Sequence, residues 1–247
     1  QPVRGVVTAT ATRVEVIEQL EQQHITEIPV IDIDGRLIGV IHYDALMEAI
    51  RKESSVDMLT MVGASRDERA LSNVSFVVRK RLPWLSINLL TAFLAAAVVG
   101  LFENTIASFT ALAVLLPVVA GQSGNTGAQS LAVTMRGLAL REIGASQWLR
   151  VARKEIAAGI INGIAIALLT SLGVLLWSSS VGLALVIGSS MVIAMAAAAF
   201  SGVIIPVILT SLGQDPAQSS SIILTTVTDV VGFFAFLGIA TMLISIL

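Results

Sequence analysis

The sequence predicts a mainly α-helical membrane protein, with five transmembrane helices per chain behind a small polar region. Of the 247 residues 55% are hydrophobic, and 22 of the 32 charged residues lie before residue 82. The remainder of the chain holds long uncharged stretches. A helix needs about 20 consecutive apolar residues to cross the hydrocarbon core of a bilayer, and these stretches supply them.

Composition narrows the function classes. The absence of cysteine excludes disulfides and thiolate metal sites. A net charge of −2 argues against a nucleic-acid partner and leaves the lipid bilayer as the expected surroundings. The N-terminus shows no signal-peptide pattern. Because the chain begins with Gln1, we expect it to be part of a longer or processed protein.

The first predicted domain covers residues 1–50. Apolar residues at helical spacing and then two short apolar runs around Asp34-Gly35 predict a helix, a hairpin and a second helix. Asp34-Gly35 is typical of a two-residue hairpin turn. The elements are expected at residues 14–22, 28–33, 37–41 and 44–50.

This order, carried by the stretch EIPVIDIDGRLIGVIHYDAL, resembles a CBS domain. CBS domains usually come in pairs that form a nucleotide or ion sensor, so the resemblance implies a partial cytosolic CBS domain. Nucleotide-binding members usually have Ser or Thr and then Asp where this chain has His42 and Ala45. Because Ala accepts no hydrogen bond from a ribose, a structural regulatory role is favoured over a nucleotide site at the CBS pair.

Residues 51–81 are expected to form a charged linker helix. The plain interpretation of its acids, Asp57, Asp67 and Glu68, is solvated helix surface. The alternative is that some of them face acids of the sensor region, where a divalent cation would relieve the repulsion and act as a latch.

The pore domain is predicted at 82–247. Its five spans are expected at about 82–103, 107–135, 155–178, 182–212 and 217–245. Trp84 stands at the start of the first span, where indole favours the membrane interface. All eight cations at the span ends fall on one side of the membrane. The positive-inside rule makes that side cytoplasmic, with the sensor region inside, the C-terminus outside and the protein in the cell membrane.

The second span has an unusual middle, residues 116–129. Pro117, Gly121, Gly124 and Gly127 stand there among polar side chains, which predicts a broken helix. Irregular backbone at membrane depth is tolerated where it lines a wet cavity, so we interpret this segment as pore wall. Asn125 either faces that pore or forms an interhelical hydrogen bond.

Asp229 is the lone acid of the last span. A carboxylate at this depth costs several kcal/mol unless it is hydrated, paired or bound to a cation. The apolar spans contain no Lys, Arg or His, so a water-filled path or a cation is favoured over a protonated carboxyl bonding a neighbouring helix. Thr225, Thr226 and Thr228 add hydroxyl groups nearby.

A homodimer would place two such carboxylates face to face across a two-fold axis. Mg²⁺ loses its water reluctantly and is typically held through one or two carboxylates with several waters retained. The donor set of acids, hydroxyls, an amide and carbonyls therefore suits a largely hydrated Mg²⁺.

With these residues in view, the membrane region resembles the MgtE family of magnesium channels. The resemblance is carried by RKRLPWLSINLLTAF, LLPVVAGQSGNTGAQSLAVTMRGLA and DPAQSSSIILTTVTDVVGFF. It implies a homodimeric Mg²⁺-selective channel closed by cytosolic Mg²⁺ through the CBS and plug-helix region, so that Mg²⁺ is both transported and regulatory.

The resemblance also implies site residues. Asp229 would select hydrated Mg²⁺ at the dimer axis and Asn125 would assist it. Asp215 would lie near the cytoplasmic mouth, although by itself it is typical of a helix N-cap. Asp57 falls where the family has a sensing acid. The remaining pore-lining residues would be Pro117, Ala120, Gly121, Gly124, Thr225, Thr226, Thr228 and Ser221, the last standing where the family has asparagine.

Two other classes compete with a channel. A secondary transporter would move another divalent cation (Mn²⁺, Co²⁺) or a solute, coupled to H⁺ or Na⁺ through Asp229. An enzyme is disfavoured, because an aspartyl protease needs two acids in one site and the two histidines, His24 and His42, lie outside the membrane region.

Overall fold

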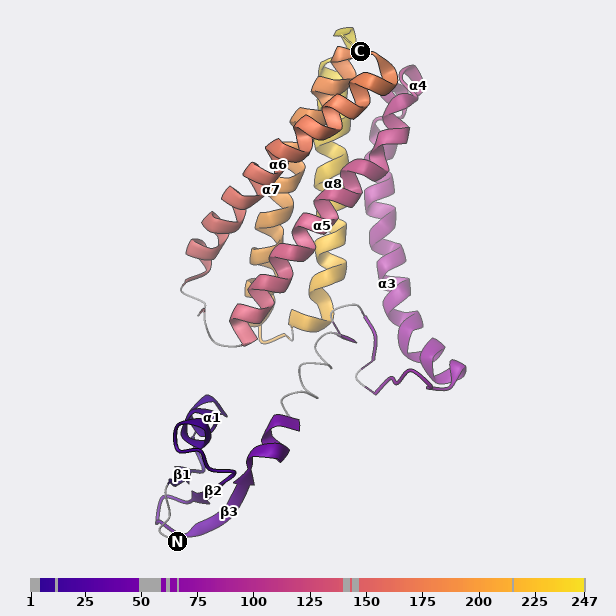
Figure 1. The fold of residues 1–247 in the computed structure, drawn as a ribbon. Coiled ribbons are helices and arrows are strands. Elements are labelled where there is room, and N and C mark those ends of the chain that lie inside the picture. Colours follow the sequence, from indigo (N-terminus) through magenta and orange to yellow (C-terminus); the bar gives the residue numbers. More distant parts are fainter. Residues whose placement is uncertain are drawn as a thin grey trace. The chain divides into compact units, whose positions relative to one another are not determined.

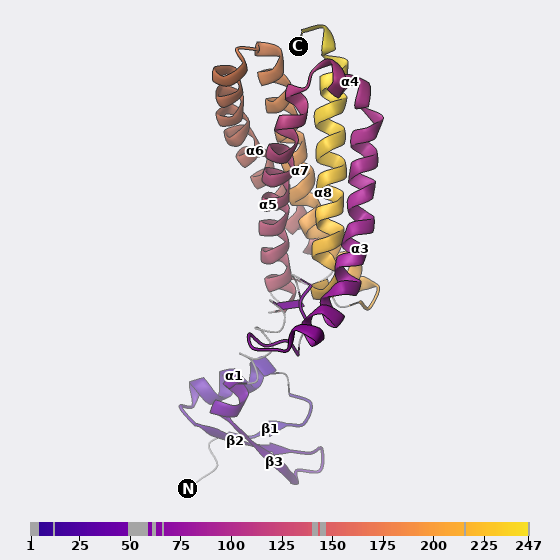
Figure 2. The same ribbon diagram turned by 90° about the vertical axis from the view of Figure 1, so that its right-hand side faces the viewer.

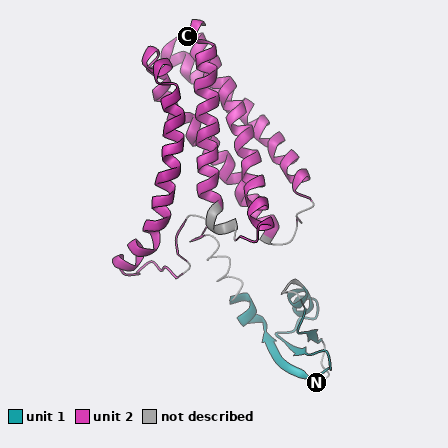
Figure 3. Ribbon diagram, turned by 180° about the vertical axis from the view of Figure 1, so that it is seen from behind, with its two compact units in different colours: residues 1–58 teal, residues 59–247 magenta. Residues whose placement is uncertain are grey.

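The computed structural model describes residues 5–246 except 12, 49–58, 61–62, 66, 140–142, 144–146 and 215. The chain forms two compact units, Gln1–Met58 and Leu59–Leu247 (Figure 3). Two expected site residues, Asp57 and Asp215, lie outside the described residues, so their predicted roles stay predictions.

The first unit is a three-stranded sheet with a helix. The strands lie in the order β1-β2-β3, with β1 parallel and β3 antiparallel to β2 (Figure 1). Its core is small and consists of Val7, Val16, Leu20 and Ile28. The predicted helix and both predicted strands are confirmed, and residues 43–48 are helical. The elements are β1 Val7–Thr8, α1 Arg13–Gln22, β2 Glu27–Ile31 and β3 Leu37–His42.

The two-residue hairpin turn at Asp34-Gly35 is wrong. The Asp32 N–H donates to the Arg36 carbonyl at 3.0 Å, which leaves three residues in the loop. Asp32 Oδ1 also accepts from the Asp34 and Arg36 N–H groups, and Gly35 adopts φ +77°. Three-residue hairpin loops commonly close with a left-handed residue, which Gly35 supplies without steric cost.

In the second unit Leu59 and Thr60 are helical, and a loop then replaces the expected continuous linker helix. Residues 63–65 and 67–69 form turns and coil, and residues 51–58 lie outside the described part. Gly63 has φ +79°, which ends helical geometry there. A new helix, α3 Val74–Leu101, starts eight residues before the predicted span, because the Asn73 side chain caps it by accepting from the Ser75 N–H at 3.3 Å.

Four long helices follow α3 and a short connecting helix, α4 Glu103–Ser108 (Figures 1 and 2). A tight turn joins α6 to α7 at the predicted place. Ser179 is left-handed with φ +54°, and Ser180 Oγ caps α7 by accepting from the Leu183 N–H. The long helices are α5 Ala111–Ala139, α6 Trp148–Ser178, α7 Val181–Ser211 and α8 Pro216–Met242, which a short turn, η2 Ile244–Ile246, follows.

Helix α7 forms the centre of this unit and packs against α5, α6 and α8. Small residues allow close approach. A methyl group at Gly159 of α6 would lie 2.7 Å from Ala199 Cβ of α7. Ser130 Oγ of α5 donates to the Ala199 carbonyl at 2.8 Å. Small residues and interhelical hydrogen bonds are the usual basis of helix association in membranes.

Four helices in the described part are long and apolar enough to cross a membrane: α3, α6, α7 and residues 220–242 of α8. The chain is therefore a multi-pass, mainly α-helical membrane protein. Helix α5 has 29 residues, enough to span, but polar side chains interrupt its apolar character.

Candidate functional site

The predicted break in the second span is wrong, because α5 is one continuous helix with Pro117 inside it. The hydroxyl groups in its middle bond to the backbone of the same helix. Ser123 Oγ donates to the Val119 carbonyl at 2.8 Å and Thr126 Oγ1 to the Gln122 carbonyl at 2.9 Å. Pro117 removes only the hydrogen bond to the Ala113 carbonyl. The helix therefore keeps its geometry despite its glycines.

Helix α5 has one packed and one open face. Ser123, Gly127 and Ser130 are buried, whereas Pro117, Gly121 and Asn125 recur every four residues and are exposed. A methyl group added at Gly121 or at Gly124 would meet no atom within 4 Å. The residues that we expected to line a pore thus share the open side, with Ala120 and Gly124 half-exposed beside them.

Helix α8 carries a matching polar row. Ser221, Thr225 and Asp229 follow one another at four-residue spacing, which places them on one face of the helix. Thr225 is exposed, and Ser221 and Asp229 are half-buried. Thr228 differs, because it is buried and its hydroxyl donates to the Thr225 carbonyl at 3.0 Å. The half-buried Thr226 hydroxyl donates to the Ile222 carbonyl at 2.8 Å.

The contacts between α5 and α8 bring the two polar rows to the same level. A methyl group on Gly232 would lie 3.3 Å from Val119 Cγ1 and 3.5 Å from Ser123 Oγ. One on Gly127 would lie 3.3 Å from Thr228 Cγ2. Asp229 therefore stands opposite the segment 123–127, which includes Asn125. Figures 1 and 2 show α5 and α8 side by side.

Neither key side chain is satisfied within the described part of the chain. The Asp229 carboxylate and the Asn125 amide make no hydrogen bond there. In lipid, an unpartnered polar group costs several kcal/mol, and a carboxylate costs more. The two groups consequently need water, a cation or a second protein surface. No cluster of three or more His, Asp or Glu side chains able to hold a metal occurs among the described residues.

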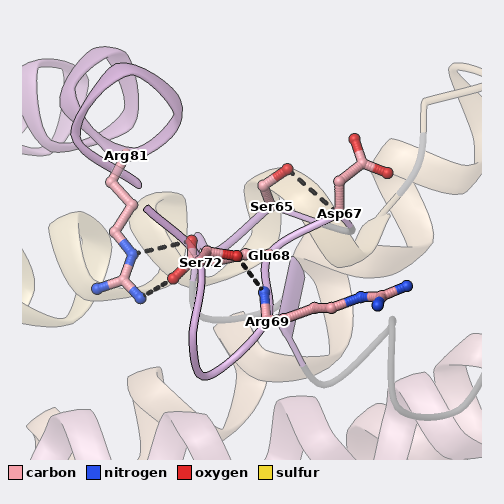
Figure 4. A network of polar contacts seen from close by, with 6 residues as sticks. All are labelled: Ser65, Asp67, Glu68, Arg69, Ser72 and Arg81. Atoms are coloured by element: carbon pink, nitrogen blue, oxygen red, sulfur yellow. Dashed lines mark hydrogen bonds and ion pairs between the residues drawn. The ribbon is translucent and has the colours of Figure 1, made fainter. Parts of the chain in front are cut away.

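The loop before α3 is fastened to that helix. Arg81 Nε donates to Glu68 Oε2 at 3.1 Å and Arg81 Nη2 donates to Oε1, a bidentate pair (Figure 4). This hydrogen bonding holds the pKa of Glu68 below its ordinary value. A methyl group on Gly63 would overlap the Trp84 indole, so the ring covers this glycine closely. The loop itself is closed by the Arg69 N–H, which donates to Ser72 Oγ at 2.8 Å.

Comparison with known proteins decides the family. The family described as MgtE, divalent cation transporter, matches residues 116–239, which is half of the chain and includes both polar rows. The chain belongs to the MgtE family. Because this is a transporter family, the interpretation as a non-enzyme is confirmed. The CBS domain matches residues 2–52.

Relatives named "Magnesium transporter MgtE" support the family assignment. The Bacillus subtilis protein is 30% identical over 92% of this chain, and the Thermus thermophilus protein is 31% identical over 93%. The Enterococcus faecalis protein is 30% identical over 92%. The chain spans about half the length of these relatives, 50% or 51% of each.

Sequence reasoning missed Glu155, a buried acid near the start of α6. Its carboxylate lies 2.8 Å from Lys154 Nζ. Helical spacing could have revealed it. Glu155, Gly159 and Gly163 follow one another every four residues and so share one face of α6, and both glycines are buried against α7.

Proposed function

We propose that this MgtE family member moves hydrated Mg²⁺ across the cell membrane along the open faces of α5 and α8. The observation that carries the proposal is the shared level of Asn125 and Asp229, two polar groups without a partner in the described part of the chain. A retained hydration shell explains why one carboxylate and one amide suffice on each chain, since the ion's waters donate to them. The relatives' names point to the same ion.

A homodimer completes the path in this proposal. The last span contributes a single carboxylate per chain, and a two-fold axis beside the open face of α5 brings two together. The small residues of that face, Pro117, Gly121 and Gly124, allow a hydrated ion to approach the backbone. The oxygens offered to the ion's waters come from Asp229, Asn125, Thr225 and Ser221, with Asp215 proposed at the cytoplasmic mouth.

The proposed topology has five spans, with α5 as the polar one. Its Gln and Asn side chains need hydrogen-bond partners that lipid cannot supply, and a wet path provides them, which is consistent with this assignment. The sensor region lies in the cytoplasm and the C-terminus outside, as the clustered cations at the span ends favour. We propose residues 1–50 as the partial CBS domain, 51–81 as the linker and 82–247 as the pore domain.

Gating by cytosolic Mg²⁺ is the regulatory part of the proposal. The Glu68–Arg81 pair and the Trp84–Gly63 contact fix the linker loop to the first turns of α3. If the segment before the loop moves, α3 therefore moves with it, because the loop is held against the helix. Asp57 is proposed as one of the acids that sense the ion.

Flux into liposomes tests the transport proposal. Asp229→Ala and Asp229→Asn in the 247-residue chain should lower Mg²⁺ uptake about 100-fold, because two charged acceptors at about 1.5 kcal/mol or more each are lost per dimer. Glu103→Gln, which removes an acid from the short helix α4, is the matched control and should leave uptake unchanged.

Two outcomes would contradict the proposal. Unchanged uptake in Asp229→Ala would refute the ion path, and Ca²⁺ or Mn²⁺ competing as well as Mg²⁺ would refute its selectivity. The competing class, a carrier coupled to H⁺ or Na⁺ through Asp229, predicts that uptake follows the proton or sodium gradient. The channel predicts that uptake follows only voltage and the Mg²⁺ gradient.

A further inference from the structure

A pocket lies between α3 and α8, on the N-terminal side of Asp229 along α8. It has a volume of about 200 Å³ and is lined by Trp84, Leu85 and Asn88 of α3 and by Ser221, Ile222 and Thr225 of α8. Three of its six lining residues carry uncharged oxygen groups. The pocket therefore offers hydrogen-bonding groups beside its apolar ones.

Asn88 gives the pocket its chemistry. Its side-chain amide makes no hydrogen bond in the described part of the chain, and only its backbone carbonyl is used, by Thr91 Oγ1 at 2.9 Å. An amide left without partners within an apolar helix costs free energy unless water reaches it. Each water occupies about 30 Å³ in the liquid, so the pocket has room for several.

The pocket connects to the proposed ion path. Ser221 and Thr225 line it, and Asp229 follows Thr225 by four residues on the same face of α8. Four residues of α-helix rise about 6 Å, so water in the pocket lies one helical turn from the carboxylate. Helix α3 contacts α8, and Figure 2 shows the two helices side by side.

We propose that this pocket is a vestibule for a hydrated divalent cation, in which Asn88 of α3 holds the ion's waters before Asp229 receives the ion. The inference rests on the proposed function. The amide oxygen and the two hydroxyl oxygens accept hydrogen bonds from coordinated water without adding charge. They attract the hydrated ion too weakly to trap it, as a conducting path requires. Helix α3, which contacts mainly α8 within the chain, thereby becomes part of the path.

Cysteine accessibility tests the vestibule directly, because the chain has no cysteine of its own. Asn88→Cys in liposomes should react with a membrane-impermeant thiol reagent at least about tenfold faster than Ser86→Cys, since reaction requires the thiolate and therefore water. Ser86 lies on the same helix but two residues away, on the opposite side, and is absent from the pocket lining. Mg²⁺ should slow the reaction saturably, and Na⁺ at equal ionic strength should not.

Thr225→Cys probes the α8 side of the pocket and should show the same protection by Mg²⁺. This second variant tests the proposal even if Asn88→Cys fails to fold. Equal reaction at positions 86 and 88, or reaction at 88 and 225 that Mg²⁺ leaves unchanged, would overturn the vestibule. Wild-type liposomes without Mg²⁺ uptake would instead refute the proposed transport, while Mg²⁺ protection in the same preparation would still support the cation site.

Discussion

Among the glycines that the structure describes, a Cβ added at Gly202 of α7 would come closest to the backbone of another helix, and its replacement by alanine gives a quantitative test of the packing. The new Cβ would lie 2.6 Å from the Gly127 carbonyl oxygen, 2.8 Å from the Leu131 nitrogen and 2.8 Å from Ser130 Cβ. Ordinary contacts between carbon and other heavy atoms begin at about 3.5 Å. Helices α5 and α7 must therefore separate by somewhat less than about 1 Å at this point.

Two costs follow from that separation. Overpacking of a well-packed interior costs about 1–3 kcal/mol. The bond from Ser130 Oγ to the Ala199 carbonyl, 2.8 Å long, crosses the same interface, and its loss costs about 0.5–1.5 kcal/mol. A total of about 2.5 kcal/mol corresponds to a fall in Tm of about 5–10 °C for a domain of this size.

Thermal unfolding in detergent, followed by size-exclusion fluorescence, measures the change. Gly173→Ala in α6 is the matched control, because a methyl group there meets no atom within 4 Å and alanine favours the helix by about 0.5–1 kcal/mol. A Tm of Gly202→Ala equal to that of the wild type or of Gly173→Ala would refute the close approach of α5 and α7.

Three further predictions concern the path and the linker. Asn125→Ala should lower Mg²⁺ flux in liposomes about fivefold while the protein elutes as wild type, because two neutral acceptors for the ion's waters, at about 0.5 kcal/mol each, are lost per dimer. Unchanged flux would remove Asn125 from the path. Asp229→Cys should form a disulfide between two copies under mild oxidation if the side chains meet at a two-fold axis, and a mass measurement showing only monomer would count against the dimer. The pKa of Glu68 is lowered because Arg81 donates to it, so its contribution to holding the loop is complete above the ordinary value of 4.5 and is lost as the pH falls through the lowered value. Proteolysis of the 63–73 loop should therefore accelerate over that pH range in the wild type. The Glu68→Gln variant should be cleaved rapidly at every pH in that range.

Four apolar spans, in α3, α6, α7 and α8, were predictable because charge and hydropathy change sharply at their ends. The turn at Ser179 and Ser180 was found from its local composition, since short polar residues there end one helix and cap the next. The start of α3 was misplaced, because the hydrophobic pattern begins at residue 82 while the cap that starts the helix is Asn73. Hydropathy reports where lipid begins and says little about where hydrogen bonding begins.

The site was predictable by residue but not by geometry. The open-face residues Pro117, Gly121 and Asn125 were chosen because Gly and Pro signal a break, yet α5 remains helical. Hydroxyl groups that bond their own backbone and neighbours that pack on Gly127 outweigh the low helix propensity of glycine, and neither effect is visible in sequence spacing alone. Asn88 was missed for a related reason, because its significance depends on α8 lying beside it.

The central position of α7 has a consequence for how ion preference can change in this fold. Its Ala194 and Ala198 stand where methyl groups on Gly232 of α8 and Gly127 of α5 would touch them, so α7 acts as a spacer that sets the gap between the two polar helices. Adding or removing one methyl group on α7 alters that gap by a fraction of an ångström without altering any oxygen ligand. On the proposed path, the width available to a hydrated ion is thus set by an apolar helix that does not contact the ion.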